Sequence, residues 1–390
     1  MLNSNPNRLY VVDALRGFAI VSILLLHNIE HFDLYFKPEG LAWWVKQIDQ
    51  GIWDTLFFLF GGKSYAIFAL LFGLTFHIQS ENRRLKGKPF SLRFAWRMVL
   101  LLVFGLFNSV FYQGDILTIY ATLGLFLVFI EKWSTKTLWW LAIIFMLQPY
   151  EWLQLVNGIL HPVAKLTDPL SWSYFGKMEV YAKGSSFIDT AIGNLSNGKL
   201  AVINWTWENG RVFQTLSLFL LGIIAGRESI FSTTNKNKQL YKSILISAVI
   251  AFIPLFIFKN NLSIVSPYQS VIRPLSVIIS SWSNMAFMLI LVSTFVIFYN
   301  KNALKNALNI FAPIGQMSLS NYIIQSILGS ILYYGFGFAL YQYTGATYSL
   351  LIGIVLIFIQ YKFSMYWMQK HKHGPLETIW HNLTWGIKNK

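Results

Sequence analysis

Ten apolar runs, each near the length that crosses a bilayer as an α-helix, constrain the fold more than any other feature of this sequence. A helix satisfies its own backbone hydrogen bonds, so it can cross the hydrocarbon core of a membrane. We therefore predict an all-α, polytopic transmembrane helix bundle of about ten spans, forming one integral membrane domain over residues 1–390. The runs lie at roughly residues 11–30, 53–78, 95–113, 115–131, 137–156, 213–227, 241–258, 275–299, 318–341 and 347–368.

The composition agrees with a membrane protein. Hydrophobic residues make up 55% of the chain and charged residues 12%, whereas an average soluble domain is about 25% charged. The chain has no cysteine, which excludes disulfides, thiolate metal sites and a cysteine nucleophile. No HExxH, paired-histidine or EF-hand pattern occurs, so we expect no metal site. We also expect no tightly bound cofactor.

The distribution of positive charge predicts the orientation. The net charge is +15, which could indicate a nucleic-acid partner. If the N-terminus is cytoplasmic, however, 21 Lys and Arg residues fall in cytoplasmic segments and nine in external ones. This split follows the positive-inside rule. We therefore place both termini in the cytoplasm and expect membrane lipid, not nucleic acid, as the partner of the basic segments.

The connection over residues 157–212 is the only sizeable polar segment. It is too short for an independent domain of usual size, and it contains aromatic residues such as Trp172, Phe175 and Trp205. We expect it to pack over the outer mouth of the bundle as short interfacial helices. An inverted-repeat transporter of two five-helix halves would show matching broken segments, and none is visible in the sequence.

Arg16 and His27 share the first apolar run. His27 lies eleven residues after Arg16, which is about 16 Å at about 1.5 Å per residue, and nearly three turns place both side chains on one face. One interpretation puts a charged group at the cytoplasmic mouth and a proton-transfer group deep inside, since histidine titrates near neutrality. The alternative is a histidine hydrogen-bonded between helices and an arginine reaching the headgroups.

Lys63 lies about ten residues inward from the outer end of the second run. At about 1.5 Å per residue, this places it at a depth similar to that of His27. The Gly-Lys-Ser run around it lacks the first glycine and the preceding strand of a P-loop, so nucleotide binding is excluded. Lys63 is either a counter-charge to a carboxylate such as Asp54 or Asp115, or an anion-binding group.

Two further polar features have structural explanations as well as functional ones. Asp115 follows a glycine at the outer turn between the third and fourth runs, where capping of a helix is the simpler role. Asn321 and Gln325 lie on one stripe of the ninth run. Such a stripe either joins helices or lines a cavity.

Several motifs resemble known families. Arg16, ten intervening residues and His27 match the signature of the acyltransferase family three proteins within the transmembrane acyltransferase superfamily. That family includes O-acetylases of cell-surface polysaccharides. The rest of the chain resembles the YeiB-like family of bacterial membrane proteins. The matching motifs are Leu70-Leu71-Phe72-Gly73 after Lys63, Gly114-Asp115-Ile116-Leu117 with Tyr120-Ala121, Gly315-Gln316-Met317-Ser318-Leu319-Ser320-Asn321-Tyr322 with Gln325-Ser326, and Gly374-Pro375-Leu376-Glu377 with Trp380.

The resemblance implies roles for residues of the first helix. In the superfamily an acyl-CoA enters from the cytoplasm and its acyl group passes to an acceptor at the outer side. His27 would then be the catalytic base, Arg16 would contact CoA, and Asp13 would orient or pair with Arg16. Arg93 and Arg97 would lie near the basic cytoplasmic mouth, where they suit the phosphates of CoA.

The remaining candidate residues are assigned less directly. Asn321 and Gln325 are candidates for donor binding, and Lys63, Asp115 and Tyr120 are candidates for the substrate cavity. The chain departs from the expected patterns at two places. The arginine cluster of the third helix is reduced to Arg93-x-x-x-Arg97, and Asn108 stands where many YeiB-like chains are expected to carry histidine.

These observations lead to two functional hypotheses. The first is a bacterial cytoplasmic-membrane acyltransferase that moves an acyl group, most plausibly acetyl, from acyl-CoA to an unidentified cell-envelope acceptor. The second is a transporter or flippase for a small anionic or lipid-linked solute, with Lys63 and Asn321 lining the path. Acetyl-CoA or another acyl-CoA is the expected co-substrate, and the sequence is compatible with a homo-oligomer.

Overall fold

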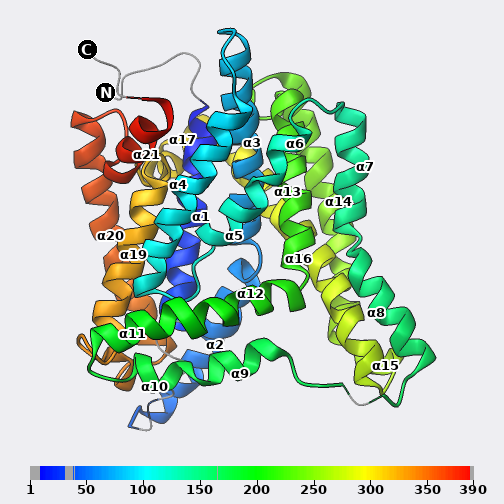
Figure 1. Ribbon diagram of the computed structural model, residues 1–390, viewed down its shortest axis with the longest axis vertical. Coiled ribbons are helices and arrows are strands. Elements are labelled where there is room, and N and C mark those ends of the chain that lie inside the picture. The colour runs from blue at the N-terminus through cyan, green and yellow to red at the C-terminus, as the bar shows by residue number, and fades with distance from the viewer. Residues whose placement is uncertain (1–8, 31–37, 39, 165, 387–390) are drawn as a thin grey trace.

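The computed structural model describes residues 9–30, 38, 40–164 and 166–386, and within them the fold is helical, with no β-strand. Figure 1 shows long helices side by side along the longest axis and short helices crossing one end. We call these the α9–α12 end and, opposite to it, the α21 end. The helices that define the two ends are α9 (Leu170–Gly176), α10 (Met178–Ala182), α11 (Phe187–Gly193), α12 (Lys199–Glu208) and α21 (Pro375–Trp385).

Six helices in the described part of the chain are long and apolar enough to cross a membrane. A seventh is counted if residues Phe187–Glu208 and α13 (Arg211–Arg227), which meet at a bend of 72°, form one span. These helices make the chain a multi-pass membrane protein. The six are α1 (Tyr10–Glu30), α2 (Trp43–Phe60) joined to α3 (Ser64–Arg84), α4 (Ser91–Phe111), α14 (Asn235–Asn260), α16 (Gln269–Tyr299) and α20 (Ala346–Lys370).

The other apolar runs form shorter helices, so helix length and hydropathy confirm six or seven of the ten predicted spans. One physical reason is visible between α7 and α8, where Gln148 adopts a left-handed φ of 58° just before Pro149 and divides one run in two. These helices are α5 (Leu117–Gly124), α6 (Phe126–Ile130), α7 (Thr135–Met146), α8 (Pro149–Leu160), α13 and α19 (Ser318–Tyr333). The connecting helices are α15 (Leu262–Val265), α17 (Asn302–Leu308) and α18 (Ala312–Gln316).

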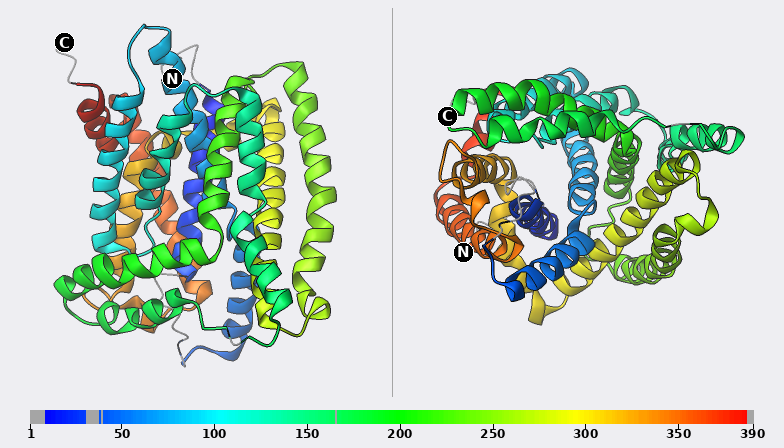
Figure 2. Two further views of the ribbon diagram at one scale, coloured as in Figure 1. Left: turned by 45° about the vertical axis from the view of Figure 1, so that its right-hand side comes forward. Right: turned by 90° about the horizontal axis from the view of Figure 1, so that it is seen from below.

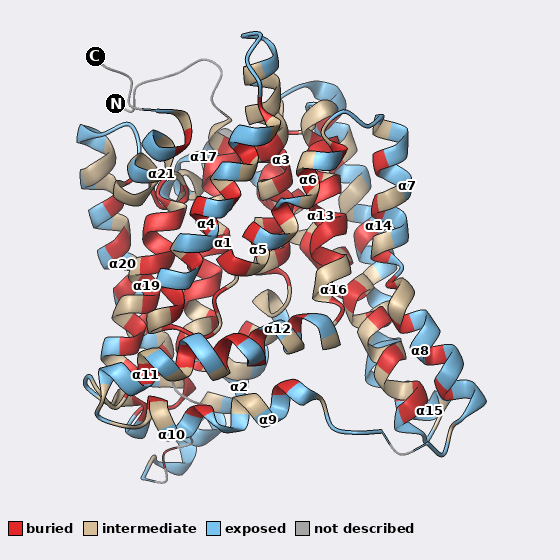
Figure 3. Cartoon of the chain, in the orientation of Figure 1, coloured by how far each residue is buried: buried red, intermediate tan, exposed pale blue. Residues whose placement is uncertain are grey.

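The helix α1 lies inside the bundle and α14 lies at its periphery. In α1, 72% of the apolar window is buried, against 11% in α14. The view from below in Figure 2 shows α1 surrounded by other helices, and Figure 3 shows the buried residues concentrated around α1, α3 and α13. The helix that carries Arg16 and His27 is therefore an interior helix, while the apolar outer face of α14 is suited to lipid.

The helices α3 and α13 pack with their backbones close together. A Cβ at Gly73 would clash with the backbone of Phe219, and a Cβ at Gly222 would clash with the backbone of Leu70. Small residues permit such close approach between membrane helices. This contact fixes α3 and α13 relative to each other, and the first turns of both helices border the site described next.

Candidate functional site

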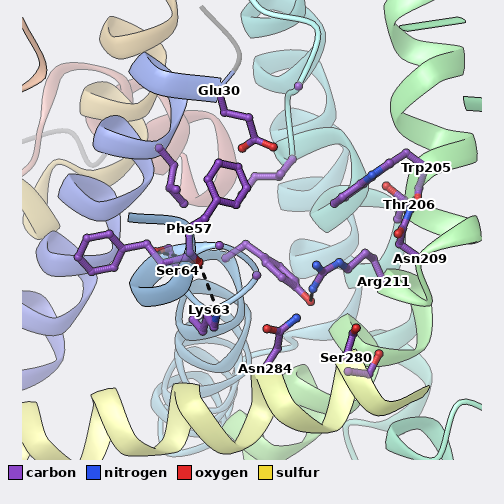
Figure 4. A pocket seen from close by; sticks show the side chains of 18 of the residues that line it. Glu30, Phe57, Lys63, Ser64, Trp205, Thr206, Asn209, Arg211, Ser280 and Asn284 are labelled. Carbon is purple, nitrogen blue, oxygen red and sulfur yellow. Dashed lines mark hydrogen bonds between the residues drawn. The ribbon is translucent and has the colours of Figure 1, made fainter. Parts of the chain in front are cut away.

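A cavity of about 1040 Å³ lies toward the α9–α12 end of the bundle. Its wall is built from segments far apart in the sequence, shown from close by in Figure 4. These are the last turns of α1, α2 and α14, the first turns of α3 and α13, the turn before α5, the first half of α16, and side chains of α9 and α12. The volume corresponds to the upper end of the range of small-molecule sites.

His27 lines this cavity from the last turn of α1. Its ring lies against the ring of Tyr112, with centroids 4.6 Å apart, and 6.3 Å from the ring of Tyr322. Both tyrosines are buried, so two aromatic side chains restrict the orientation of the imidazole. His27 is therefore a titratable group held at the wall of the cavity.

Lys63 lies on the wall of the same cavity as His27. It belongs to the break between α2 and α3, where Gly62 has a φ of 75° that favours glycine. Its Nζ donates to the carbonyl oxygen of Phe57 at 3.4 Å and lies 5.3 Å from the centre of the Phe287 ring. A buried ammonium with one long hydrogen bond keeps donor capacity for a ligand.

Arg211 and Lys259 also line the cavity, and the sequence reasoning did not single them out. Arg211 donates to the hydroxyl of Tyr65 at 2.6 Å and to Oε1 of Gln214 at 2.9 Å. Lys259 belongs to the last turn of α14. Both cations lie at the ends of apolar runs, which could have marked them as candidate site residues. Sequence spacing could not show that these ends face one cavity.

Asp115 does not line the cavity. It is fully buried and accepts hydrogen bonds from Nδ2 of Asn108 at 3.0 Å and from the backbone NH of Thr118 at 2.9 Å. Its Oδ2 also lies 3.3 Å from Nζ of Lys199 in α12. Asp115 therefore caps the first turn of α5, the simpler role expected for it, and ties α12 to the bundle. Asn108, at the position where histidine was expected, is one of its partners.

Tyr120 lines the cavity as predicted from the family motif. Its hydroxyl donates to the backbone carbonyl of Tyr65 at 2.6 Å. The bond links α5 to the first turn of α3, next to Lys63. Tyr120 thus supports the cavity wall while its ring faces other aromatic side chains, including Phe72 and Phe219.

The residues predicted to bind the donor lie toward the α21 end, away from this cavity. Arg16 lies 3.3 Å from Oδ1 of Asp13 and donates to Oγ1 of Thr75 at 3.1 Å. The predicted pairing of Asp13 with Arg16 is therefore present. None of Asp13, Arg16, Arg93 and Arg97 lines the cavity.

Arg93 and Arg97 both contact α21. The guanidinium of Arg97 lies 3.3 Å from the centre of the Trp380 ring, and Arg93 donates to the carbonyl of Thr384 at 3.4 Å. Trp380 in turn donates to the backbone carbonyl of Arg97 at 3.1 Å. Arg97 is thereby engaged in packing, while Arg93 remains exposed at the end of the bundle.

Asn321 and Gln325 join helices. Nδ2 of Asn321 donates to Oγ of Ser364 at 2.9 Å, and Nε2 of Gln325 donates to Oε1 of Gln360 at 3.0 Å. Nε2 of Gln360 donates to the backbone carbonyl of Asn321 at 3.2 Å. Both residues are buried in the interface of α19 with α20 and off the cavity wall. These contacts agree with the helix-joining alternative for the stripe, and donor binding by Asn321 and Gln325 stays a prediction.

Glu377 connects the segment around Gly374–Trp380 to the segment around Gly315–Tyr322. It lies in α21 and accepts bonds from the backbone NH groups of Leu319 and Ser320, at 2.7 and 3.1 Å, and from Oγ of Ser320 at 2.5 Å. These bonds satisfy donors at the start of α19. Burial raises the pKa of the Glu377 carboxyl, although the bonds from Ser320 and Leu319 act in the opposite direction.

Comparison with known proteins supports the family resemblance. A family model described as "Protein of unknown function (DUF418)" matches residues 225–387. The protein YxaH of Bacillus subtilis is 27% identical over 403 residues, covering 97% of this chain and 94% of its own length. The protein YeiB of Escherichia coli is 24% identical over 412 residues, covering 96% and 95%. The family model and these end-to-end matches support the resemblance of the chain to a YeiB-like family of bacterial proteins.

Proposed function

We propose that this chain is a membrane-bound acyltransferase that moves an acyl group such as acetyl from cytoplasmic acyl-CoA to a cell-envelope acceptor held in the cavity. The observation that carries the proposal is the placement of His27 on a cavity wall that also holds cationic and hydroxyl side chains. Arg16 lies eleven residues away on the same interior helix, about 16 Å toward the other end.

We further propose ten spans in the bacterial cytoplasmic membrane, with the α21 end in the cytoplasm and the α9–α12 end outside. The excess of Lys and Arg in the segments assigned to the cytoplasm supports this orientation. So does the position of α21 and the start of α1 at one end in Figure 1. Pairs of short helices such as α5 with α6 and α7 with α8 each supply one span.

In the proposed reaction, the ring nitrogen of His27 takes the proton from an acceptor hydroxyl. The hydroxyl oxygen then bonds to the thioester carbonyl carbon, the carbon–sulfur bond breaks, and the CoA thiolate leaves and receives a proton. Asp13 holds Arg16 by their ion pair, so that the guanidinium can meet the donor at its cytoplasmic side. Arg93, which is exposed, adds positive charge there.

One observation favours transport as a second candidate. Two helix breaks line the cavity, at Gly61–Lys63 between α2 and α3 and at Asn209 between α12 and α13. The sequence had shown no such matching breaks. Discontinuous helices whose ends point at a polar site are typical of secondary transporters. In that case the cationic wall would bind an anionic solute on its way across the membrane.

Release of CoA from acetyl-CoA by the purified protein separates the two candidates. Because the chain has no cysteine, a thiol-reactive dye reports free CoA without protein background. We expect His27→Ala to slow release by about 10²–10⁴-fold, the usual contribution of a general base. His161→Ala is the matched control, because His161 is exposed after α8 and off the cavity. Equal release by wild type and His27→Ala would refute the proposal.

A further inference from the structure

Three cations converge on one cavity from three distant parts of the chain. Lys63 precedes α3, Arg211 begins α13 and Lys259 ends α14. Because Lys63, Arg211 and Lys259 line the same cavity, their like charges repel one another. Grouping like charges beside an apolar core costs free energy that a bound anion offsets.

The cations are held in place by their surroundings. The hydroxyl of Tyr65 and the side chain of Gln214 position the Arg211 guanidinium. A Cβ at Gly62 would lie 2.6 Å from Nδ2 of Asn284 and 3.2 Å from the Arg211 guanidinium, so the break before α3 lies directly against both. Figure 4 shows Lys63, Asn284 and Arg211 on one side of the cavity, and Glu30 on the other.

Two helix N-termini add positive potential at the same place. The helix α3 has 21 residues and α13 has 17, and neither has a side-chain cap on its first amides. Ser64, Tyr65 and Arg211 of these first turns all line the cavity. The positive end of the helix dipole and the unbonded NH groups of such a turn favour an anion, phosphate above all.

The acidic side chains on the wall do not neutralise the cations. Within the described residues, neither Lys63, Arg211 nor Lys259 forms an ion pair with a carboxylate. Asp54 accepts a bond from Gln50 at 3.0 Å. The cationic wall is therefore open to a ligand, while hydroxyl and amide groups such as Ser280 and Asn209 can bond its hydroxyls.

We propose that Lys63, Arg211 and Lys259 bind the phosphoryl group of the acceptor, so that the acceptor is a hydroxylated phosphate ester with its hydroxyl directed toward His27. This inference rests on the proposed function for the role of the hydroxyl, but the phosphate site does not depend on acyl transfer. A planar guanidinium binds phosphate oxygens in pairs, and two ammonium groups add charge without fixed geometry. The ester is either a soluble sugar phosphate or the headgroup of a hydroxylated phospholipid.

Binding of glycerol phosphate to the full-length protein in neutral detergent tests this site directly. Titration calorimetry at constant ionic strength, with chloride as the competing anion, gives the affinity. We expect Lys259→Gln to weaken binding about tenfold or more, as for loss of a charge-assisted bond to phosphate. Lys242→Gln is the matched control, because Lys242 lies on α14 but not on the cavity. Lys63→Gln tests a second cation, and a thermal melt confirms that each variant is folded.

A second arm identifies the source of the phosphate. Native mass spectrometry of protein reconstituted with phosphatidylglycerol and phosphatidylcholine measures lipid retention. Tight binding of glycerol phosphate that falls in Lys259→Gln supports the site with a soluble ester. Selective retention of phosphatidylglycerol that falls in the same variant supports it with a lipid headgroup. If neither ligand binds, or if Lys259→Gln and Lys242→Gln bind both alike, the phosphate site is refuted. If the wild-type protein binds either phosphate ester but releases no CoA from acetyl-CoA, acyl transfer is refuted and the phosphate site is not.

Discussion

At the scale of single residues, the buried pair of Asp115 and Lys199 joins the α9–α12 end to the rest of the bundle. Removing one partner of a buried ion pair leaves an uncompensated charge and costs about 3–5 kcal/mol. We therefore expect Asp115→Ala to lower the unfolding free energy by that amount in a thermal or chemical melt. Asp168→Ala, at an exposed position, should melt like wild type. Identical midpoints for the two variants would contradict the structural role.

The raised pKa of Glu377 predicts a dependence of stability on pH. At a pH between the ordinary pKa of 4.5 and the raised pKa of the folded state, Glu377 keeps its proton in the folded state and loses it in the unfolded state. Stability from this group is therefore complete below pH 4.5 and is lost as pH rises through the folded pKa. Melting midpoints of wild type should fall across that window relative to Glu377→Gln, which cannot ionise. Parallel pH profiles would contradict the prediction.

The sequence could indicate residue types at the site but not their partners. His27 and Lys63 stood out because charged and titratable groups are rare in spans, and both line the cavity. Asn321 and Gln325 occupied an equally polar stripe, yet they face α20. Spacing gives the face of a helix, whereas its neighbour is decided by tertiary packing.

At the scale of elements, the break between α2 and α3 gives the cavity its shape. Gly62→Ala should destabilise the protein by about 1–3 kcal/mol, because the left-handed backbone is strained for alanine and a Cβ meets Asn284 and Arg211. The same variant should weaken phosphate binding. Gly51→Ala inside α2 meets no atom within 4 Å and should be neutral or stabilise by up to about 1 kcal/mol. Equal effects of both changes would contradict this account of the break.

Helix breaks were the part of the fold that the sequence predicted least well. Pro254 and Pro274 lie inside α14 and α16 without ending them, because neighbouring groups can satisfy the backbone around a proline in a membrane helix. Gln148, in contrast, adopts a left-handed conformation and separates α7 from α8. Its Nε2 donates to the carbonyl of Gly210 at 3.0 Å, a contact between segments that sequence patterns cannot foresee.

At the scale of the whole molecule, the apolar runs predicted an all-helical membrane bundle because hydrophobicity over about 20 residues is a strong signal. Each predicted run overlaps at least one helix of the structure. Six or seven of the described helices are long and apolar enough to cross a membrane, because several of the ten runs divide into shorter helices. The cavity itself could not be predicted, because eight or more segments contribute to its wall.

The proposed account assigns the two ends of α1 to opposite faces of the membrane and makes His27 essential for transfer between them. The most direct test supplies acetyl-labelled acetyl-CoA to the outside of sealed, inside-out membrane vesicles that contain the wild-type protein or His27→Ala. Label in the lumenal or lipid fraction and free CoA outside are then measured together. The account predicts equal appearance of acetyl label and free CoA with wild type, and neither above background with His27→Ala. Label transfer that is unchanged in His27→Ala would contradict it.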